Sequence, residues 1–278
     1  QAIADSYKKL SLKGIVTDFI GYESVTKATS RVVAIMKKDQ EVDTLSAGEN
    51  AEIFVEETPF YGEKGGQIGD TGVIEGDGSL FEVWDTQCPL DNLMTHIGKL
   101  KKGTIRVGDT VDLLVDVERR RAIEAHHSGT HLLNAALKKT LGDHVKQSGS
   151  LVTPERLRFD FTHFSKIEDE EMDKIELLAN EFIQANRDVN TRILPKEEAM
   201  KTGAAAVFDE KYGDQVRVVK MGDYSAELCG GTHVDKTGDI GLIKVVGESS
   251  VAAGVRRIEA VSGKEAVMYL KSIESELK

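Results

Sequence analysis

The stretch ERRRAIEAHHSGTHLLNAALKKT, residues 118–140, decides how the rest of the chain is interpreted. Its apolar residues recur at intervals of three and four and no proline interrupts them, a pattern that predicts one long helix. His127 and His131 are four residues apart and therefore project from one face of this helix, one turn apart. Gly142 follows shortly after, where we expect the helix to end.

A second stretch, ELCGGTHV at residues 227–234, supplies the other half of a candidate metal site. Paired glycines between Cys229 and His233 favour a tight turn that can bring the thiolate and the imidazole to one point. Three imidazoles and one thiolate are ligands that Zn²⁺ prefers in tetrahedral geometry. We therefore predict one zinc ion per chain, held by His127, His131, Cys229 and His233. Four protein ligands describe a closed site, so the sequence leaves open whether the zinc is catalytic, positioning or structural.

Composition places the chain among globular proteins. Its 278 residues suffice for one large domain or two moderate ones, with 30% charged and 40% hydrophobic residues. Eighteen apolar residues never run together and the N-terminus QAIADSYKKL is polar, so neither a membrane helix nor a signal peptide is predicted. The two cysteines, Cys88 and Cys229, give no disulfide framework, and we expect a reducing, cytoplasmic setting.

Charge argues against nonspecific nucleic-acid binding, because the formal net charge is −11. Two local clusters remain candidates for RNA phosphates, and the alternative for each is a solvated face or ion pairs with the many acids. They are Arg119, Arg120 and Arg121, and Arg256 and Arg257.

Residues 12–117 read as β structure. Short runs rich in Val, Ile, Phe and Thr, separated by turn clusters, predict a closed or nearly closed barrel. The expected strands lie within 12–22, 30–36, 51–57, 71–75, 79–86 and 109–117. The glycine-rich stretch PFYGEKGGQIGDTG, 59–72, is either a plain loop or backbone that passes close to a ligand.

The second half reads as α+β. Strands are expected at 144–152, 156–162, 189–194, 215–220, 240–246 and 254–261. A helix is expected after Ser165, which with Glu168 would form a capping box, and its apolar stripe predicts core packing. The expected fold is thus α+β, with a β-barrel domain at 1–117, an α+β zinc-containing domain at 118–263 and the start of a C-terminal helix at 264–278.

Several motifs in fixed order resemble the editing domain of alanyl-tRNA synthetase and of the related free-standing deacylases. They are HHSGTHLLNAAL, HVKQSGSLV, RLRFDF, YSAELCGGTHV and GVRRIEAVSG, preceded by FYGEKGGQIGDTG. The resemblance covers nearly the whole chain from about Leu12. We find no class II aminoacylation domain and the ends look cut, so we expect an excised synthetase fragment rather than a free-standing deacylase.

The resemblance implies hydrolysis of the ester of Ser-tRNA(Ala), and of Gly-tRNA(Ala), by part of a class II alanine–tRNA ligase. It implies zinc on the four residues named above, with Thr130 and Gln147 beside the metal as catalytic pocket residues. Ser148, Gly149 and Ser150 would contact substrate, and Gly65, Gly66 and Gln67 would approach the acceptor end of the tRNA. Without the resemblance, the alternative for Thr130 is a hydroxyl that bonds back to a helix carbonyl, and the alternative for Gln147 is an exposed strand residue.

Three readings stay open at this stage. The first is a hydrolase acting on the acceptor end of mischarged tRNA(Ala), either as a synthetase fragment or as a free-standing trans-editing enzyme. The second is an RNA-binding module whose zinc is purely structural. The third is a zinc hydrolase of an unrelated ester. None involves DNA or a membrane, and the sequence assigns neither a general base nor an oligomeric state.

Overall fold

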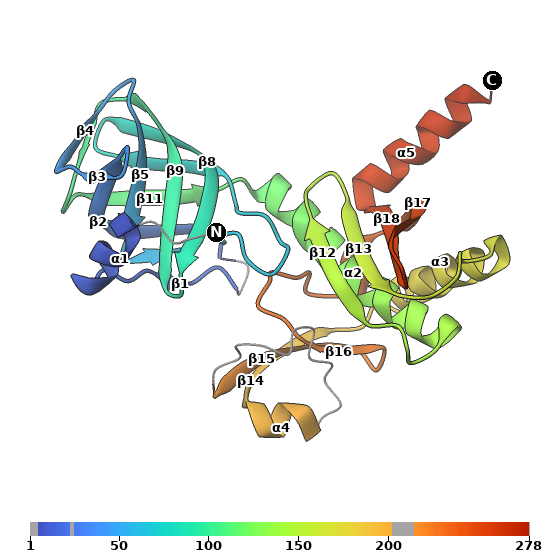
Figure 1. Cartoon of the computed structure of the whole chain (residues 1–278). Helices are drawn as coiled ribbons and strands as arrows, with labels where there is room; N and C mark the ends of the chain where they lie inside the picture. The colour runs from blue at the N-terminus through green and yellow to red at the C-terminus, as the bar shows by residue number, and fades with distance from the viewer. Residues whose placement is uncertain (1–4, 23–24, 202–213, 278) are drawn as a thin grey trace. The chain divides into compact units, whose positions relative to one another are not determined.

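The structure is a computed structural model that describes residues 5–22, 25–201 and 214–277 (Figure 1). The chain divides into two compact units. Unit 1 comprises residues 1–64 and 68–120, and unit 2 comprises residues 65–67 and 121–278. Sequence patterns did not anticipate that three residues between the barrel strands belong to the second unit.

Unit 1 is a β-barrel preceded by helix α1, Asp5–Leu12. Within the described residues, six antiparallel strands close on themselves because β11 pairs both with β7 and with β2. In barrel order they are β11 (Thr110–Val115), β7 (Gly72–Gly76), β8 (Ser79–Leu90), β9 (Leu93–Lys102), β5 (Asn50–Val55) and β2 (Lys27–Lys37). Shorter strands complete the unit: β1 (Asp18–Phe19), β3 (Gln40–Glu41), β4 (Thr44–Ser46), β6 (Glu57–Thr58) and β10 (Thr104–Arg106).

The barrel forms because alternate side chains along each strand are apolar and point inward. Its core includes Val32, Ile53, Phe81 and Leu113, all at most 2% exposed. This confirms the predicted barrel, with two differences. The run 12–22 contributes only β1, and β9 was missed.

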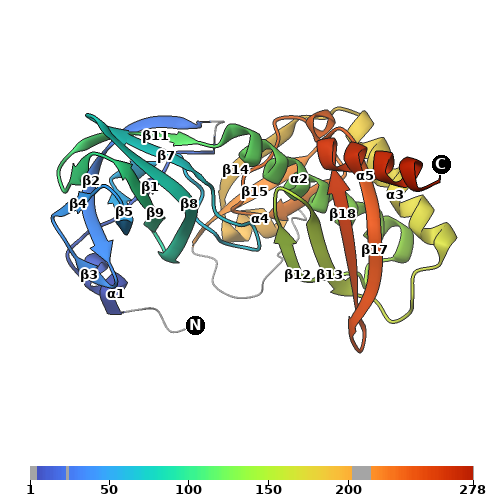
Figure 2. The same cartoon turned by 90° about the horizontal axis from the view of Figure 1, so that it is seen from above.

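Unit 2 packs two helices against a four-stranded antiparallel sheet (Figure 2). The sheet order is β12 (Gln147–Val152), β13 (Leu157–Thr162), β18 (Val255–Ser262) and β17 (Ile243–Ala252). Helices α2 (Val117–Leu141) and α3 (Asp169–Gln184) share a core with this sheet. Leu133 from α2, Phe159 from β13 and Ile175 from α3 are completely buried in that core.

The predicted long helix is confirmed as α2, and it ends where glycine allows it to. Gly142 has φ +113°, and its N–H donates to the Lys138 carbonyl at 2.9 Å. The predicted capping box of α3 was three residues too early. Glu168 caps α3 with Glu171, whereas the Ser165 hydroxyl contacts His163 Nε2 at 3.3 Å.

A second sheet in unit 2 precedes the turn at residues 229–233, which contains Cys229. It consists of β14 (Val189–Pro195), β15 (Gln215–Met221) and β16 (Ser225–Leu228), in that order. The remaining elements are α4 (Lys196–Lys201), a short 3-10 helix (Thr237–Ile240) and α5 (Gly263–Glu276), the last of which confirms the helix expected near the C-terminus. Among the described residues, no helix combines the length and the apolarity needed to cross a membrane.

Candidate metal centre

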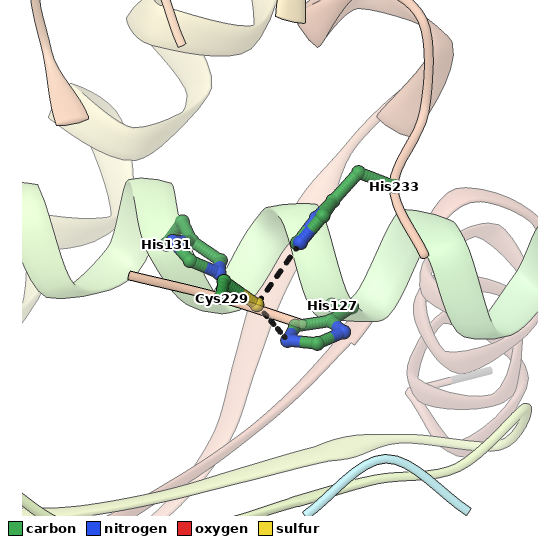
Figure 3. A group of neighbouring side chains, drawn as sticks. All are labelled: His127, His131, Cys229 and His233. Carbon is green, nitrogen blue, oxygen red and sulfur yellow. Dashed lines mark hydrogen bonds between the residues drawn. The ribbon is translucent and has the colours of Figure 1, made fainter. Parts of the chain in front are cut away.

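Four side chains from two distant parts of the sequence meet in unit 2 (Figure 3). Helix α2 presents His127 and His131 on one face, and the turn that follows β16 presents Cys229 and His233. One potential ligand atom from each of the four lies within 4.8 Å of the others. The residues singled out by their spacing therefore gather in a cluster that is compatible with a metal site.

Two distances from the cysteine sulfur are close to those of a tetrahedral metal site. Cys229 Sγ lies 3.4 Å from His127 Nε2 and 3.3 Å from His233 Nε2. Bonds of about 2.3 Å to sulfur and about 2.0–2.1 Å to nitrogen place neighbouring ligands of tetrahedral zinc roughly 3.4–3.6 Å apart. The donor set and these two distances are compatible with a zinc site, whereas Mg²⁺ and Ca²⁺ prefer oxygen ligands.

The electrostatics of the cluster favour a thiolate. Burial opposes ionisation of the Cys229 thiol, but the neighbouring His127 and His233 outweigh it and hold its pKa well below the ordinary value. Burial, with a smaller contribution from His127, lowers the pKa of His233 to about 3, so this ring is neutral at physiological pH. A metal ion needs a deprotonated thiol and neutral imidazoles with a free lone pair.

Each histidine of the cluster is also contacted through Nδ1, the ring nitrogen that faces away from the sulfur. His127 Nδ1 lies 2.7 Å from Gln67 Oε1, and His233 Nδ1 lies 3.1 Å from Ser128 Oγ. His131 Nδ1 lies 3.0 Å from the carboxylate of Glu227, although the two groups are not aligned as a hydrogen bond. Such outer partners are the usual support of metal-binding histidines.

Glu227 is the anionic partner in this outer ring. It is 5% exposed, and its other oxygen accepts a hydrogen bond of 2.7 Å from Asn134 Nδ2. Burial raises the pKa of this carboxyl, but His131 and the other neighbouring donors outweigh it, and the net pKa lies below the ordinary value. Burial lowers the pKa of His131, yet Glu227 and Cys229 overcome this and raise it to about 10.

The turn at residues 229–233 is shaped to approach His127 closely. A Cβ at Gly231 would collide with the His127 ring, so glycine is required there. Arg217 holds the same turn from β15, since its Nη1 donates to the carbonyls of Cys229 and Gly231, each at 2.9 Å.

Comparison with known proteins now identifies the family. Residues 1–119 match the family described as tRNA synthetases class II (A), and residues 216–259 match the threonyl and alanyl tRNA synthetase second additional domain. An alanine–tRNA ligase of Chelativorans sp. (strain BNC1) is 51% identical over 272 residues, covering 94% of this chain and 31% of the relative. A second, from Desulfosudis oleivorans, is 49% identical over 267 residues, covering 96% of this chain and 30% of the relative.

The chain belongs to the alanyl-tRNA synthetase family. It spans about a third of the length of the curated relatives it matches. The second additional domain that these synthetases share overlaps the turn that carries Cys229 and His233. The resemblance drawn from the sequence motifs is therefore confirmed at the level of the family.

Two predicted pocket residues of this synthetase relative lie on α2 and β12. Thr130 is 5% exposed, and its hydroxyl donates to the His126 carbonyl at 2.8 Å. Gln147 is half-buried at the start of β12, and its Nε2 donates to Ser150 Oγ at 3.2 Å. Of the neighbouring predicted residues, Ser148 is exposed, whereas Gly149 lies at a bulge where β12 pairs with β13.

The predicted acceptor-end residues 65–67 lie along β12 in unit 2. The Gly66 carbonyl accepts the N–H of Val152 at 2.7 Å, and Gly66 has φ +89°. A Cβ at Gly66 would lie 2.6 Å from the Ser150 carbonyl oxygen, so the close approach requires glycine. Gln67 is fully buried and its amide is used inside the protein, so its side chain is not part of an exposed RNA surface.

The arginine clusters are less available than their sequence suggests. Arg120 is 1% exposed and paired with Asp70, so its buried position removes it from the proposed RNA surface. Arg119 donates to the Gly69 carbonyl at 2.7 Å, whereas Arg121 is exposed. In β18, Arg256 pairs with Glu248 and Arg257 pairs with Asp160.

The sequence did not predict which residues support the histidines of the cluster. Asn134 follows His127 and His131 at the next helical interval, so the i, i+4, i+7 spacing could have identified it. Glu227 precedes Cys229 by two residues in ELC, which on an extended strand places the two side chains on one side. No spacing rule connects Gln67 to His127, because the two are 60 residues apart.

Proposed function

We propose that this chain hydrolyses the ester bond of mischarged tRNA(Ala) that carries serine or glycine. The observation that carries the proposal is the partly buried cluster of three imidazoles and one thiol group in a relative of alanine–tRNA ligases. Zn²⁺ is the proposed ion, and when bound it would supply positive charge for the ester carbonyl or hold the substrate in place. The cytoplasm is the proposed location.

The chemistry asks little of the protein beyond orientation. An aminoacyl ester is already activated, so the site must orient a water, accommodate the developing oxyanion and hold the amino acid. We assign the last task to Thr130 and Gln147. The Thr130 hydrogen is directed to the His126 carbonyl, which leaves the oxygen lone pairs to accept the hydrogen of a substrate hydroxyl.

Recognition of the tRNA is proposed at the acceptor end. The exposed Arg121 and the partly buried Arg119, Arg256 and Arg257 are candidates for phosphate contacts, together with the backbone of Gly65 and Gly66. The four candidate metal ligands lie on α2 and on the turn at 229–233. Ser148, Gly149 and Ser150 of β12 are the proposed substrate contacts.

A specific observation favours one second candidate. Four protein ligands form a closed set, which is typical of structural zinc. The alternative is therefore an RNA-binding module in which the metal only stabilises unit 2.

Deacylation assays distinguish the two functions. The purified chain is incubated with labelled Ser-tRNA(Ala), Gly-tRNA(Ala) and Ala-tRNA(Ala), and the released amino acid is followed over time. Hydrolysis of the serine and glycine esters with Ala-tRNA(Ala) spared supports the proposal. Binding of tRNA without turnover supports the structural alternative, and equal hydrolysis of an aminoacyl ester without RNA would point to an unrelated esterase.

A further inference from the structure

Gln67 is an outer partner of the cluster that lies far in sequence from both α2 and the 229–233 turn, since it is 60 residues from His127 and 165 residues from Thr232. It lies in the three-residue segment that belongs to unit 2 although it is flanked on both sides by unit 1. It is fully buried, and its amide makes three hydrogen bonds, all within unit 2. A buried amide with this many partners has a defined orientation.

The hydrogen bonds of Gln67 determine which of its atoms faces which neighbour. The backbone N–H of Thr232 can only donate, and it lies 3.0 Å from Gln67 Oε1. Gln67 Nε2 donates in turn to the Thr232 hydroxyl at 2.9 Å. The oxygen is therefore the amide atom that lies 2.7 Å from His127 Nδ1.

This orientation fixes the tautomer of His127. An amide oxygen accepts and never donates, so the proton of the neutral ring must reside on Nδ1. The lone pair of the ring is then on Nε2, the nitrogen that lies 3.4 Å from Cys229 Sγ. Gln67 thus orients the ring so that, in the neutral form, the lone pair on Nε2 faces the cluster.

The same amide also binds the 229–233 turn. Gln67 bonds both the backbone and the side chain of Thr232, three residues after Cys229 and one before His233. Gly231 of this turn lies against the His127–Gln67 contact, and a Cβ there would lie 2.7 Å from Gln67 Oε1. One side chain therefore connects His127 on α2 to the turn that carries Cys229 and His233.

We propose that Gln67 is a positioning residue that sets the tautomer of His127 and the position of the 229–233 turn for metal binding. It is not one of the four residues that would hold the ion. The inference rests on the proposed metal site, but it needs neither tRNA nor turnover to be tested.

The test measures metal affinity in the full chain. Zn²⁺ affinity is obtained by competition with a chromophoric chelator for wild type, Gln67→Leu and Gln67→Glu. Loss of an outer partner typically lowers metal affinity about 10–100-fold, and we expect this range for Gln67→Leu. Gln67→Glu keeps an oxygen for His127 and Thr232, so it should retain affinity within about threefold of wild type, since the acceptor is what the ring needs. Gln184→Leu, at the exposed end of α3, is the matched control.

A spectroscopic readout separates positioning from a general loss of folding. With Co²⁺ in place of zinc, the visible bands report tetrahedral geometry and the bond to sulfur. We expect altered bands for Gln67→Leu and wild-type bands for Gln67→Glu, with unchanged far-ultraviolet circular dichroism in both. Equal zinc affinity and equal cobalt spectra in wild type and Gln67→Leu would overturn the role of Gln67 alone. If the wild type binds neither ion, the proposed metal site fails and the inference fails with it.

Discussion

The guanidinium of Arg120 is buried against the carboxylate of Asp70, fifty residues earlier in the chain. Both side chains are 1% exposed, and Asp70 also accepts the N–H of Tyr61 at 2.6 Å. Arg120 donates further to the Pro59 carbonyl at 2.6 Å. The first turn of α2 is thus tied to the loops of unit 1 by a fully enclosed ion pair.

Removing one member of this pair should destabilise unit 1 strongly. Arg120→Leu leaves the Asp70 carboxylate buried and unpaired, which typically costs about 3–5 kcal/mol of unfolding free energy. Urea unfolding followed by Trp84 fluorescence reports on unit 1, because the chain has a single tryptophan and it lies in β8. Arg121→Leu, an exposed neighbour, should change the value by less than about 0.5 kcal/mol. A loss as small as that in Arg120→Leu would show that the pair is not needed.

The stability of unit 1 should fall in mild acid because of His96. Burial lowers the pKa of His96 to about 4 in the folded protein, although its bond to the Ile53 carbonyl opposes this. The unfolded chain takes up a proton near pH 6.5 that the folded state refuses until about pH 4. Stability contributed by the neutral ring is therefore complete above pH 6.5 and decreases below it, by a total on the order of 3 kcal/mol.

The variant His96→Gln tests this dependence, since it cannot titrate. Urea midpoints by Trp84 fluorescence at several values between pH 7 and pH 4 should fall more steeply for wild type than for the variant. His144→Gln, at an exposed histidine in unit 2, should follow the wild-type slope. Parallel slopes for wild type and His96→Gln would contradict the assignment.

Cys229→Ala should remove both metal and activity. The change deletes the thiolate ligand, so zinc content should drop well below one ion per chain in elemental analysis, with hydrolysis of Ser-tRNA(Ala) falling in parallel. Cys88→Ala is the matched control, because Cys88 lies in β8 of unit 1. Full zinc content in a His127→Ala, Cys229→Ala double variant would exclude this site.

Selectivity should depend on Thr130 and Gln147. Serine is larger than alanine, so for the serine ester the site cannot exclude alanine by size and must recognise the serine hydroxyl through a hydrogen bond. A site built for such a bond can discriminate by roughly four orders of magnitude. Thr130→Val keeps the shape and removes the hydroxyl, and it should lower the serine rate and narrow the serine-over-alanine ratio.

Gln147→Ala should act in the same direction, with zinc still bound in both variants. Initial deacylation rates on Ser-tRNA(Ala) and Ala-tRNA(Ala), measured beside metal content, check the prediction. Wild-type rates and ratio in both variants would mean that the pocket lies on other residues.

The parts of the fold that the sequence predicted are those with strong local signals. The apolar spacing of 118–140 and the stripe of α3 gave two helices, and runs of β-branched residues gave most barrel strands. Strand β9 was missed because LMTHIGKLKK contains lysines, a histidine and a central glycine. Gly98 is there because a Cβ would collide with the Glu82 carbonyl of β8, a tertiary constraint with no local signal.

The candidate metal ligands could be predicted from the sequence, whereas the residues that hydrogen-bond to them could not. Histidine and cysteine are rare enough in this chain that their spacing revealed the four clustered residues. Gln67 and Ser128 are common polar types, and only their burial and hydrogen bonds distinguish them. The burial of Arg120 was equally invisible, since its neighbour Arg121 is exposed.

The position of Gln67 in the chain also has a consequence for how the protein is made. Gln67 and Thr232 are separated by 165 residues, so the ribosome adds Gln67 to the chain long before it adds Thr232. At about 5–20 residues per second, the delay is roughly 8–33 seconds. During that interval the barrel strands can pair, whereas the cluster cannot form because the turn at 229–233 has not yet been synthesised. The cluster can therefore be completed only after all six barrel strands of unit 1 have been made, since the last of these strands ends at Val115.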